Sequence, residues 1–407
     1  MNKEVAIIGG GPSGLAAATT LKRLGVERVT LIEREAQAGG IPRHCGHPPF
    51  GMREFGRVLD GPRYARRLVE RADKLGVDIR CSTSVVSLQP HGVLTLSDNN
   101  GQSHLKAERV VLATGVREGS RAARFIGGDR TRGIVSTGAL QSLVYLEKMR
   151  PFKRPIIIGS ELVSFSALLT CQHAGIKPCA IIEQNPRITA RLFALGLPFV
   201  RGVSVMTHTE VVRILGDGRV TGVVVRNLNS GKEETIDADG VIVSGRFTPE
   251  STLARMGGLM LDPASGGAAV DQYGRTSDSR IFVAGNALRP VETAGWSWRE
   301  GVKIGQLLAE DLLNEPADTL PECSIMVHEP IRYVVPQRIR LPLSKNNLGD
   351  VQLRVSRPVK GKLFVKINGK MIWSRRLHSL PERRITIPIK IFSVLDGGEA
   401  IEIGLSE

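Results

Sequence analysis

A glycine-rich turn between an apolar run and an alanine-rich stretch constrains this chain more than any other feature. Residues 5–8 read Val-Ala-Ile-Ile, and residues 9–14 read Gly-Gly-Gly-Pro-Ser-Gly. In such a turn Gly9 relieves the sharp bend from strand to helix, Gly11 lets the backbone approach a pyrophosphate, and Gly14 lets the helix pack closely on the strand. The helix N-terminus then donates hydrogen bonds to the phosphates. The pattern predicts a dinucleotide-binding βαβ unit.

A second apolar run and an acidic residue strengthen this interpretation. Residues 29–32 form the run, and Glu33 ends it about twenty residues after the glycines, where a carboxylate accepts hydrogen bonds from ribose hydroxyls. A glycine-rich turn alone is weak support, because such loops are common. The strand, the helix and the carboxylate in this order make the prediction specific.

The length and the cysteine pattern limit the class of protein. A chain of 407 residues is long enough for two or three domains. Its five cysteines lie far apart and form no Cys-x-x-Cys pair, so we expect reduced thiols, no metal site and no iron–sulfur cluster bound by this chain alone. The sequence has no apolar run of about eighteen residues and no signal-peptide pattern. We expect a cytoplasmic protein with at most peripheral membrane association.

Positive charge is concentrated near the C-terminal end. The formal net charge is +15, and residues 331–407 contain fifteen Lys or Arg against six Asp or Glu. Such a surplus can attract nucleic acid, anionic lipid or an acidic protein, or it can simply keep the surface soluble. Aromatic residues are too few there for a platform on which bases stack. We expect a protein-docking role and no nucleic-acid binding.

The strand, turn and helix pattern occurs twice in the chain. The second copy covers residues 154–183, and the chain beyond residue 316 changes to short alternating runs around an Asn368-Gly369 turn. We predict an α/β fold with two Rossmann-like, three-layer ββα dinucleotide-binding domains, the second inserted in the first, and a small C-terminal all-β domain. The expected bounds are residues 1–118 and 238–314 for the first domain, 119–237 for the second, NAD(P)-binding-like domain, and 331–407 for the β domain.

Three motifs in order carry a family resemblance over residues 1–314. They are the first glycine-rich turn with Glu33, Ala113-Thr114-Gly115 after a strand, and Gly285-Asn286 after a later strand. With them the chain resembles the FAD-dependent pyridine nucleotide-disulfide oxidoreductases, the glutathione and thioredoxin reductase superfamily. The resemblance implies FAD as the cofactor, with Asn286 offering a neutral hydrogen bond at a position that is acidic in the family. The residues expected at the cofactor are Gly9, Gly11, Pro12, Ser13, Gly14, Glu33, Arg34, Gly40, Val85, Ala113, Thr114, Gly115, Gly285 and Asn286.

Longer strings give a closer resemblance within this superfamily. They are residues 39–47, Gly-Gly-Ile-Pro-Arg-His-Cys-Gly-His, with 55–56, 61–65 and 295–301. They resemble the FAD subunits of opine oxidase, hydrogen cyanide synthase, dye-linked proline dehydrogenase and glycerol-3-phosphate-dehydrogenase-associated oxidoreductases. The resemblance implies a second flavoprotein dehydrogenase or oxidase subunit as partner, with a small iron–sulfur subunit as a further candidate. Residues 332–337 resemble the start of the β-rich ending of the glycerol-3-phosphate branch.

The second glycine-rich turn departs from the pattern. Glu161 stands where the middle glycine should be, and Ser164 stands at the third position. A carboxylate repels a phosphate at short range, which argues against NAD(P) binding. Glu183, however, occupies the ribose-binding position after the next strand. A working NAD(P) site and a structural relic or altered site therefore both remain open.

The loop after the second strand supplies the catalytic candidates. Arg43 could stabilise negative charge on a reduced flavin, and His44 or His47 could move a proton near neutral pH. The alternative is a loop that only packs beside the cofactor or a subunit face. Cys45 lacks a second cysteine at usable spacing, which favours a buried, unreactive thiol.

These observations favour an FAD-dependent oxidoreductase. The leading hypothesis is an electron-transferring subunit of a multi-subunit dehydrogenase or oxidase that acts on an amino acid, an amine or a hydroxy compound such as glycerol 3-phosphate. One alternative is a self-sufficient NAD(P)H-dependent flavin oxidoreductase. Another is a scaffolding flavoprotein whose FAD is inert.

Overall fold

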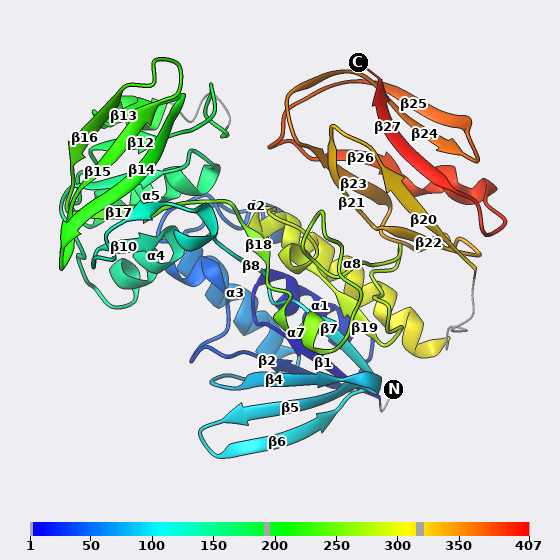
Figure 1. Cartoon of the computed structure of the whole chain (residues 1–407). Helices are drawn as coiled ribbons and strands as arrows, with labels where there is room; N and C mark the ends of the chain where they lie inside the picture. Colours follow the sequence, from blue (N-terminus) through cyan, green and yellow to red (C-terminus); the bar gives the residue numbers. More distant parts are fainter. Residues whose placement is uncertain (1–2, 191–195, 315–320, 407) are drawn as a thin grey trace.

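The computed structural model describes residues 3–190, 196–314 and 321–406. It has an α/β fold built on parallel sheets, followed by a C-terminal β unit (Figure 1). No helix in these residues is both long enough and apolar enough to span a membrane.

The first parallel sheet carries the first glycine-rich turn. Its strand order is β19, β7, β1, β2, β3. The strands are β1 (Glu4–Ile8), β2 (Arg28–Ile32), β3 (Asp78–Arg80), β7 (Arg109–Leu112) and β19 (Ile281–Val283). The helices that pack with this sheet are α1 (Pro12–Arg23), α3 (Gly61–Lys74) and α8 (Ala294–Leu313).

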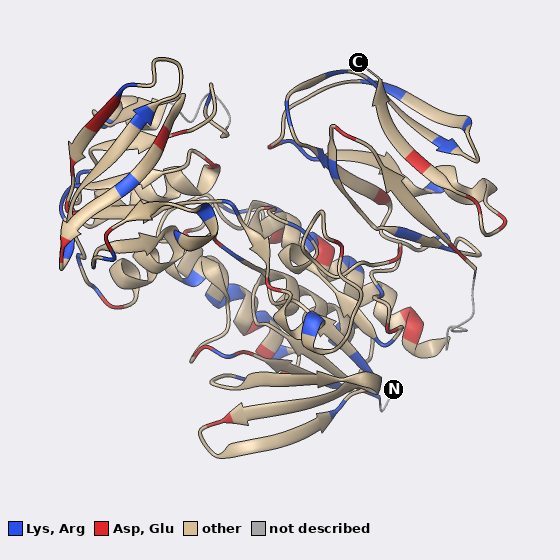
Figure 2. Ribbon diagram, in the orientation of Figure 1, with Lys and Arg blue, Asp and Glu red and all other residues tan. Residues whose placement is uncertain are grey.

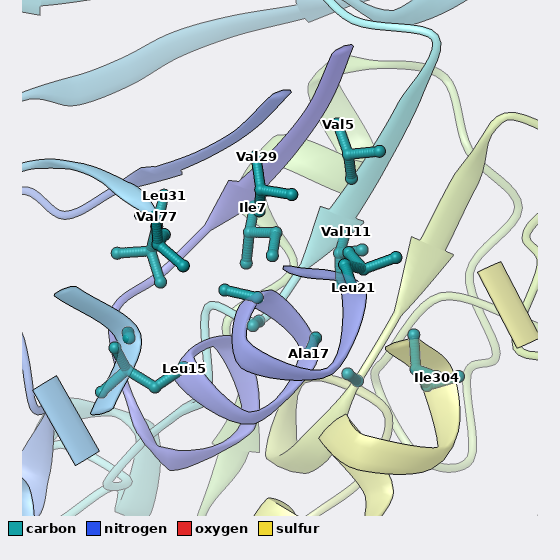
Figure 3. Packing of buried hydrophobic residues seen from close by; sticks show 14 of the residues in the cluster. Val5, Ile7, Leu15, Ala17, Leu21, Val29, Leu31, Val77, Val111 and Ile304 are labelled. Carbon is teal, nitrogen blue, oxygen red and sulfur yellow. The ribbon is translucent and has the colours of Figure 1, made fainter. Parts of the chain in front are cut away.

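Alternate residues of β1 pack on opposite faces, which explains its continuous apolar run. Val5 and Ile7 pack in a core with α1, α3 and α8 (Figure 3). Ala6 and Ile8 belong to another core, shared with an antiparallel sheet. That sheet comprises β4 (Ser84–Gln89), β5 (Val93–Asp98) and β6 (Gly101–Lys106). This half of the molecule is thus a three-layer β, β, α arrangement.

The second parallel sheet has the order β10, β17, β11, β12, β13. Its strands are β10 (Ile134–Ser136), β11 (Pro155–Ile158), β12 (Ala180–Ile182), β13 (Ser204–Met206) and β17 (Gly240–Val243). The helices α4 (Thr137–Tyr145) and α5 (Leu162–His173) share its core, as does the shorter α6 (Gly196–Val200). A further sheet joins β9 (Gly127–Gly128), β14 (Thr209–Asp217), β15 (Arg219–Asn227) and β16 (Glu233–Asp237).

The position of β17 corrects one expected boundary. We assigned residues from 238 onward to the first domain, but β17 pairs in parallel with β10 and β11 of the second sheet. An apolar run does not reveal which of two parallel sheets it joins. The chain returns toward the first sheet through β18 (Thr248–Pro249), which pairs with β8 (Val116–Arg117). The linkers between the two halves are residues 116–126, which include β8, and residues 244–249, which include β18. The division into domains otherwise stays a prediction.

The C-terminal β unit begins earlier than expected. We predicted residues 331–407, but β20 (Glu322–Val327) pairs with β22 and β27 of the same unit. Its other strands are β21 (Ile331–Val335), β22 (Arg338–Arg340), β23 (Asp350–Val355), β24 (Val359–Ile367), β25 (Lys370–Ser379), β26 (Ile385–Pro388) and β27 (Ile401–Ser406). Asn368 and Gly369 form the β24–β25 turn, and both have positive φ, as a type I′ hairpin turn requires.

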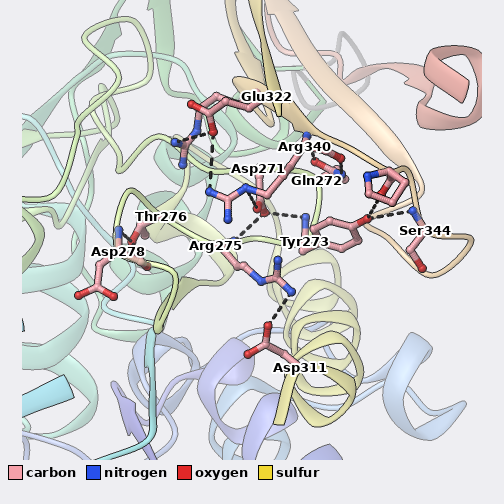
Figure 4. Close-up of polar contacts among 12 residues, drawn as sticks. Asp271, Gln272, Tyr273, Arg275, Thr276, Asp278, Asp311, Glu322, Arg340 and Ser344 are labelled. Carbon is pink, nitrogen blue, oxygen red and sulfur yellow. Dashed lines mark hydrogen bonds and ion pairs between the residues drawn. The ribbon is translucent and has the colours of Figure 1, made fainter. Parts of the chain in front are cut away.

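The β unit is joined to the first half by buried polar contacts. Gln272 donates to the Arg340 carbonyl at 2.5 Å and accepts from the Arg340 amide at 2.8 Å. Asp271 lies 3.7 Å from the Arg340 guanidinium, and within the first half Arg275 pairs with Asp311 on α8 at 2.6 Å (Figure 4). Breaking a buried pair leaves an uncompensated charge, which is strongly destabilising. The β unit is therefore an integral part of the fold.

Candidate cofactor site

The first glycine-rich turn has the geometry expected of its sequence. Gly9 has φ +110°, and a Cβ atom there would lie 2.5 Å from the Ala113 carbonyl oxygen. A Cβ atom on Gly14 would overlap the Gly9 carbonyl. Gly11 is different, because its φ is −77° and a Cβ atom would meet nothing closer than 4.0 Å. The fold therefore requires glycine at positions 9 and 14, whereas no contact within the fold requires it at position 11, where close approach of a pyrophosphate stays a prediction.

The carboxylate of Glu33 is oriented by the turn itself. It is buried and accepts hydrogen bonds from the backbone N–H groups of Gly10 and Glu35, each at 2.9 Å. Arg34 beside it is exposed, and Val85 lies half-buried on β4. The amide of Thr83 donates to the Glu33 carbonyl at 3.0 Å, so the start of β4 runs next to this carboxylate.

Two buried hydroxyl groups near the turn have no hydrogen-bond partner. They belong to Ser13 in the first turn of α1 and to Ser297 in the first turn of α8. A Cβ atom on Gly285 would lie 2.7 Å from the Ser13 hydroxyl oxygen and 3.5 Å from Ser297 Cβ. Buried polar atoms are normally satisfied, so two unpaired hydroxyls this close together indicate that a polar partner is missing next to the turn.

The other residues expected at the cofactor lie around the same turn. Gly40 has φ +63°, and a Cβ atom there would lie 2.8 Å from Gly11 Cα. Thr114 donates from its hydroxyl to the Glu250 carbonyl at 2.8 Å. Asn286 accepts from the Glu292 amide at 2.8 Å and donates to its carbonyl at 3.1 Å, so its side chain holds the loop before α8. These glycines and the free hydroxyls fit FAD, while each residue's contact with FAD stays a prediction.

The side chains of the three catalytic candidates, Arg43, His44 and His47, do not meet at one common site. Arg43 donates to the Gln37 carbonyl at 2.7 Å and lines a cavity of about 560 Å³ with Arg66 and Lys148. Burial lowers the pKa of His44, which lies beside the backbone of Gly138 at the start of α4. The lowered pKa favours a neutral imidazole at pH 7.

His47 belongs to a chain of hydrogen bonds between the two halves. Gln141 on α4 donates to the Ser166 hydroxyl on α5 at 2.7 Å, and that hydroxyl is hydrogen-bonded to His47 Nε2. Cys45 donates to Gln141 at 3.3 Å. Burial raises the pKa of the Cys45 thiol to about 12, so it is protonated at neutral pH. The 39–47 loop thus fastens the first half to α4 and α5.

The second glycine-rich turn is filled by its own side chains. Glu161 accepts a hydrogen bond from the Arg246 amide at 2.6 Å. The Ser160 hydroxyl donates to Glu183, which also accepts from the Asn185 amide at 2.8 Å and from its side chain at 2.7 Å. The groups that would meet a phosphate and a ribose are therefore already engaged within the chain.

Residues 3–301 match the model of the pyridine nucleotide-disulphide oxidoreductase family. The chain belongs to this family. Our recognition of the superfamily is confirmed, as is the prediction of an oxidoreductase. The family uses FAD and NAD(P)H, and the first turn of this member has the glycine geometry of a dinucleotide-binding turn at positions 9 and 14.

Individual relatives match this chain over only part of their length. An alkyl hydroperoxide reductase component of Xanthomonas campestris pv. phaseoli is 28% identical over 70% of this chain and 52% of its own length. Hydrogen cyanide synthase subunit HcnB of Pseudomonas protegens is 27% identical over 70% of this chain and 66% of its own. The chain thus spans about half to two thirds of these relatives. The thioredoxin reductase structure of T. acidophilum superposes with a TM-score of 0.65 and 23% identity, over 77% of this chain and 99% of that one, which supports the fold.

Several polar residues of this oxidoreductase were not anticipated. Ser297 lies between two tryptophans, Trp296 and Trp298, and has no sequence signal of its own. Arg289 is almost completely buried, and its guanidinium contacts Glu300 at 3.0 Å and Gln352 at 2.6 Å. These pairs are separated by eleven and 63 residues, so only the folded chain brings them together.

Proposed function

We propose that this chain is the electron-transferring FAD subunit of a multi-subunit dehydrogenase or oxidase. The observation that carries the proposal is the contrast between the two glycine-rich turns. The first leaves the hydroxyls of Ser13 and Ser297 unpaired beside its glycines, whereas the second is closed by Glu161. The first turn thus has polar groups without a partner, which a polar ligand would satisfy. The polar side chains of the second turn are hydrogen-bonded within the chain.

The residues of the first turn have distinct proposed roles. The N-terminus of α1, with Gly11 and Ser13, would bind the pyrophosphate, and Glu33 would bind a ribose. FAD supplies hydride and one-electron chemistry when bound. His44, whose pKa is lowered by burial, would accept a proton near this site. Arg43 and His47 remain candidates, as one lines a cavity and the other contacts α5.

The proposed partner is a second flavoprotein subunit that oxidises an amino acid, an amine or a hydroxy compound such as glycerol 3-phosphate. Support comes from the relative named as a hydrogen cyanide synthase subunit and from the positive charge of the β unit. A small iron–sulfur subunit is a further proposed partner. We propose no nucleic-acid ligand, a cytoplasmic location and at most peripheral membrane contact.

Purification from the native host under mild conditions tests this proposal. A tagged chain should bring down one stoichiometric flavoprotein, and the substrate of that partner should bleach the flavin absorbance of both chains. A chain that purifies alone and oxidises NADH or NADPH at full rate would instead be a self-sufficient flavin oxidoreductase. A complex in which the partner's substrate never reduces this chain's FAD would indicate a scaffold.

A further inference from the structure

We propose that Glu161 closes the second dinucleotide turn to nicotinamide nucleotides and braces the two linkers between the halves of the molecule. The inference deepens the proposed function, because it removes NADH and NADPH as direct electron donors at this turn. The inference is about the second glycine-rich turn, which contains Glu161, whereas FAD is proposed to bind at the first.

The position of Glu161 at the start of α5 supports the closure. Its backbone has φ −67° and ψ 167°, and its carboxylate accepts from the Arg246 amide at 2.6 Å. A Cβ atom on Gly245 would lie 2.5 Å from Glu161 Oε1, so the carboxylate is packed against the segment after β17. The carboxylate makes no hydrogen bond to the amides of α5, and it lies against the segment that adjoins this helix N-terminus. A phosphate bound at the N-terminus would therefore have a negative group beside it.

The same carboxylate is part of a set of contacts between the linkers. Arg124 donates to the carbonyls of Ser244 and Gly245 at 2.6 Å and 2.8 Å. Glu118 accepts from the amides of Gly245 at 3.1 Å and Gly138 at 2.8 Å. Both linkers are thus tied to each other and to the starts of α4 and α5.

Arg124 and Arg332 lie close enough to Glu161 to lower its pKa, which offsets part of the effect of burial. Arg124 is committed to backbone carbonyls, and Arg246 donates to the Gln184 side chain at 3.2 Å. Burial raises the pKa of Glu161, and the hydrogen bond from Arg246 opposes this rise. A phosphate entering here would have to displace these contacts and would also face the carboxylate of Glu118.

The acidic residues at the two ribose positions are held alike on one oxygen and differently on the other. The amides of Glu35 and Asn185 donate to Glu33 and Glu183 in the same way. The second oxygen of Glu33 accepts from the backbone amide of Gly10, whereas that of Glu183 accepts from the Ser160 hydroxyl. Ser160 also accepts from the Thr189 amide at 2.9 Å, so a side chain of the second turn lies where the first turn has only backbone.

The test compares Glu161→Gly with Glu161→Gln in the flavin-loaded protein. Glutamine retains the size and the acceptor oxygen, so it should keep the brace and serve as the matched control. Binding of NADH and NADPH is followed by nucleotide fluorescence. Wild type and Glu161→Gln should show no saturable binding below about 1 mM, the upper end of ordinary KM values. Glu161→Gly should bind at least about tenfold more tightly than either, because the side chain that occupies the turn is removed and the backbone can approach a pyrophosphate.

Hydrogen exchange gives a second readout, independent of nucleotides. The amide of Arg246 should exchange about tenfold faster in Glu161→Gly than in wild type, because its acceptor is lost. The amide of Gly245, which donates to Glu118, should change less. Flavin retention and circular dichroism confirm folding, and Glu161→Ala replaces the glycine variant if it misfolds.

Saturable nucleotide binding to wild type at micromolar concentration would overturn the closure. A folded Glu161→Gly protein with neither tighter nucleotide binding nor faster exchange would overturn the role of Glu161. Failure of the proposed function would appear separately, as absence of bound FAD or of a partner.

Discussion

The guanidinium carbon of Arg384 lies 3.4 Å from the centroid of the Trp296 ring. This contact joins the C-terminal β unit, which contains Arg384, to the first turn of α8, which contains Trp296. Arg53 and Arg299 approach the same ring at 4.5 Å and 5.0 Å. A guanidinium over an indole is attracted by the negative face of the ring. This contact therefore helps to hold the β unit beside the helix that contains Ser297.

Replacing Arg384 with alanine should lower the free energy of unfolding by about 1 kcal/mol, the usual size of a partly exposed cation–π contact. Bound flavin should stay at the wild-type level, because Arg384 is not part of the glycine-rich turn. Urea unfolding measures the effect, and Arg383→Ala, at an exposed neighbouring position, is the control. Equal midpoints for the two variants would show that the contact contributes nothing.

Gly11→Asp should abolish FAD retention without unfolding the protein. Gly11 has ordinary backbone angles and room for a Cβ atom, so the substitution introduces no strain and only places a carboxylate at the phosphate position. The ratio of flavin to protein should fall at least about tenfold. Gly14→Ala is an informative comparison, because its methyl group would overlap the Gly9 carbonyl and destabilise the fold itself. A yellow Gly11→Asp protein with full flavin would refute this site.

Cys45 should resist alkylation near pH 8 while Cys81 reacts. Burial raises the pKa of the Cys45 thiol to about 12, and the thiolate is the nucleophile. At this pH only about one Cys45 in ten thousand would be a thiolate. Cys81 is partly exposed and lines the cavity beside α3. Iodoacetamide labelling with peptide mass spectrometry distinguishes the two residues, and rapid labelling of Cys45 in the folded protein would contradict its burial.

The same shift gives the sign of a pH effect on stability. The pKa of Cys45 rises from 9.0 to about 12 on folding, so the folded state holds the proton more tightly. This contribution is complete below about pH 9 and is lost as the pH rises toward 12. Thermal unfolding of wild type and Cys45→Ser across this range should show a steeper alkaline loss in wild type. Parallel curves would mean that Cys45 titrates normally.

The sequence predicted the first turn well because its chemistry is local. Gly9 and Gly14 lie within one βαβ unit, and the sharp turn and the close packing expected of them follow from spacing alone. The ribose-binding role of Glu33 stays a prediction. The strand at residues 240–243 was placed in the wrong half, because its apolar run fits either parallel sheet. The Arg289–Gln352 contact was not predicted, since it joins residues that are distant in sequence and meet only when the β unit packs on α8.

The catalytic candidates show a related limit. The pattern at residues 39–47 placed Arg43, His44 and His47 in one loop, but it could not say where each side chain points. In the structure, Arg43 bonds within the loop and His47 contacts α5. Side-chain direction in an irregular loop depends on what packs against it. The loop could be predicted as important, and the role of each residue could not.

Like charges face each other on the β24–β25 hairpin. Lys362 pairs with Arg376 across the strands, and both side chains are exposed. Figure 2 shows Lys and Arg on both strands of this hairpin. Directly opposed like charges destabilise a sheet, so their presence is explained if an acidic partner surface binds here. We therefore expect this face to dock the proposed second subunit.

Arg376→Glu distinguishes a loss of docking from a loss of folding, because it should increase the stability of the chain while it decreases capture of the partner. The new carboxylate would face Lys362 and should raise the free energy of unfolding by a few tenths of a kcal/mol, up to about 1 kcal/mol. Capture of the partner should nevertheless fall at least about tenfold, since an attractive charge is reversed at the interface. Lys106→Glu on β6, an equally exposed charge reversal outside the β unit, should leave capture unchanged.

Pull-down at increasing salt completes the test, because capture by wild type should weaken as charges are screened over a Debye length of about 8 Å. If Arg376→Glu and Lys106→Glu retain the partner equally, the hairpin face is not the docking surface.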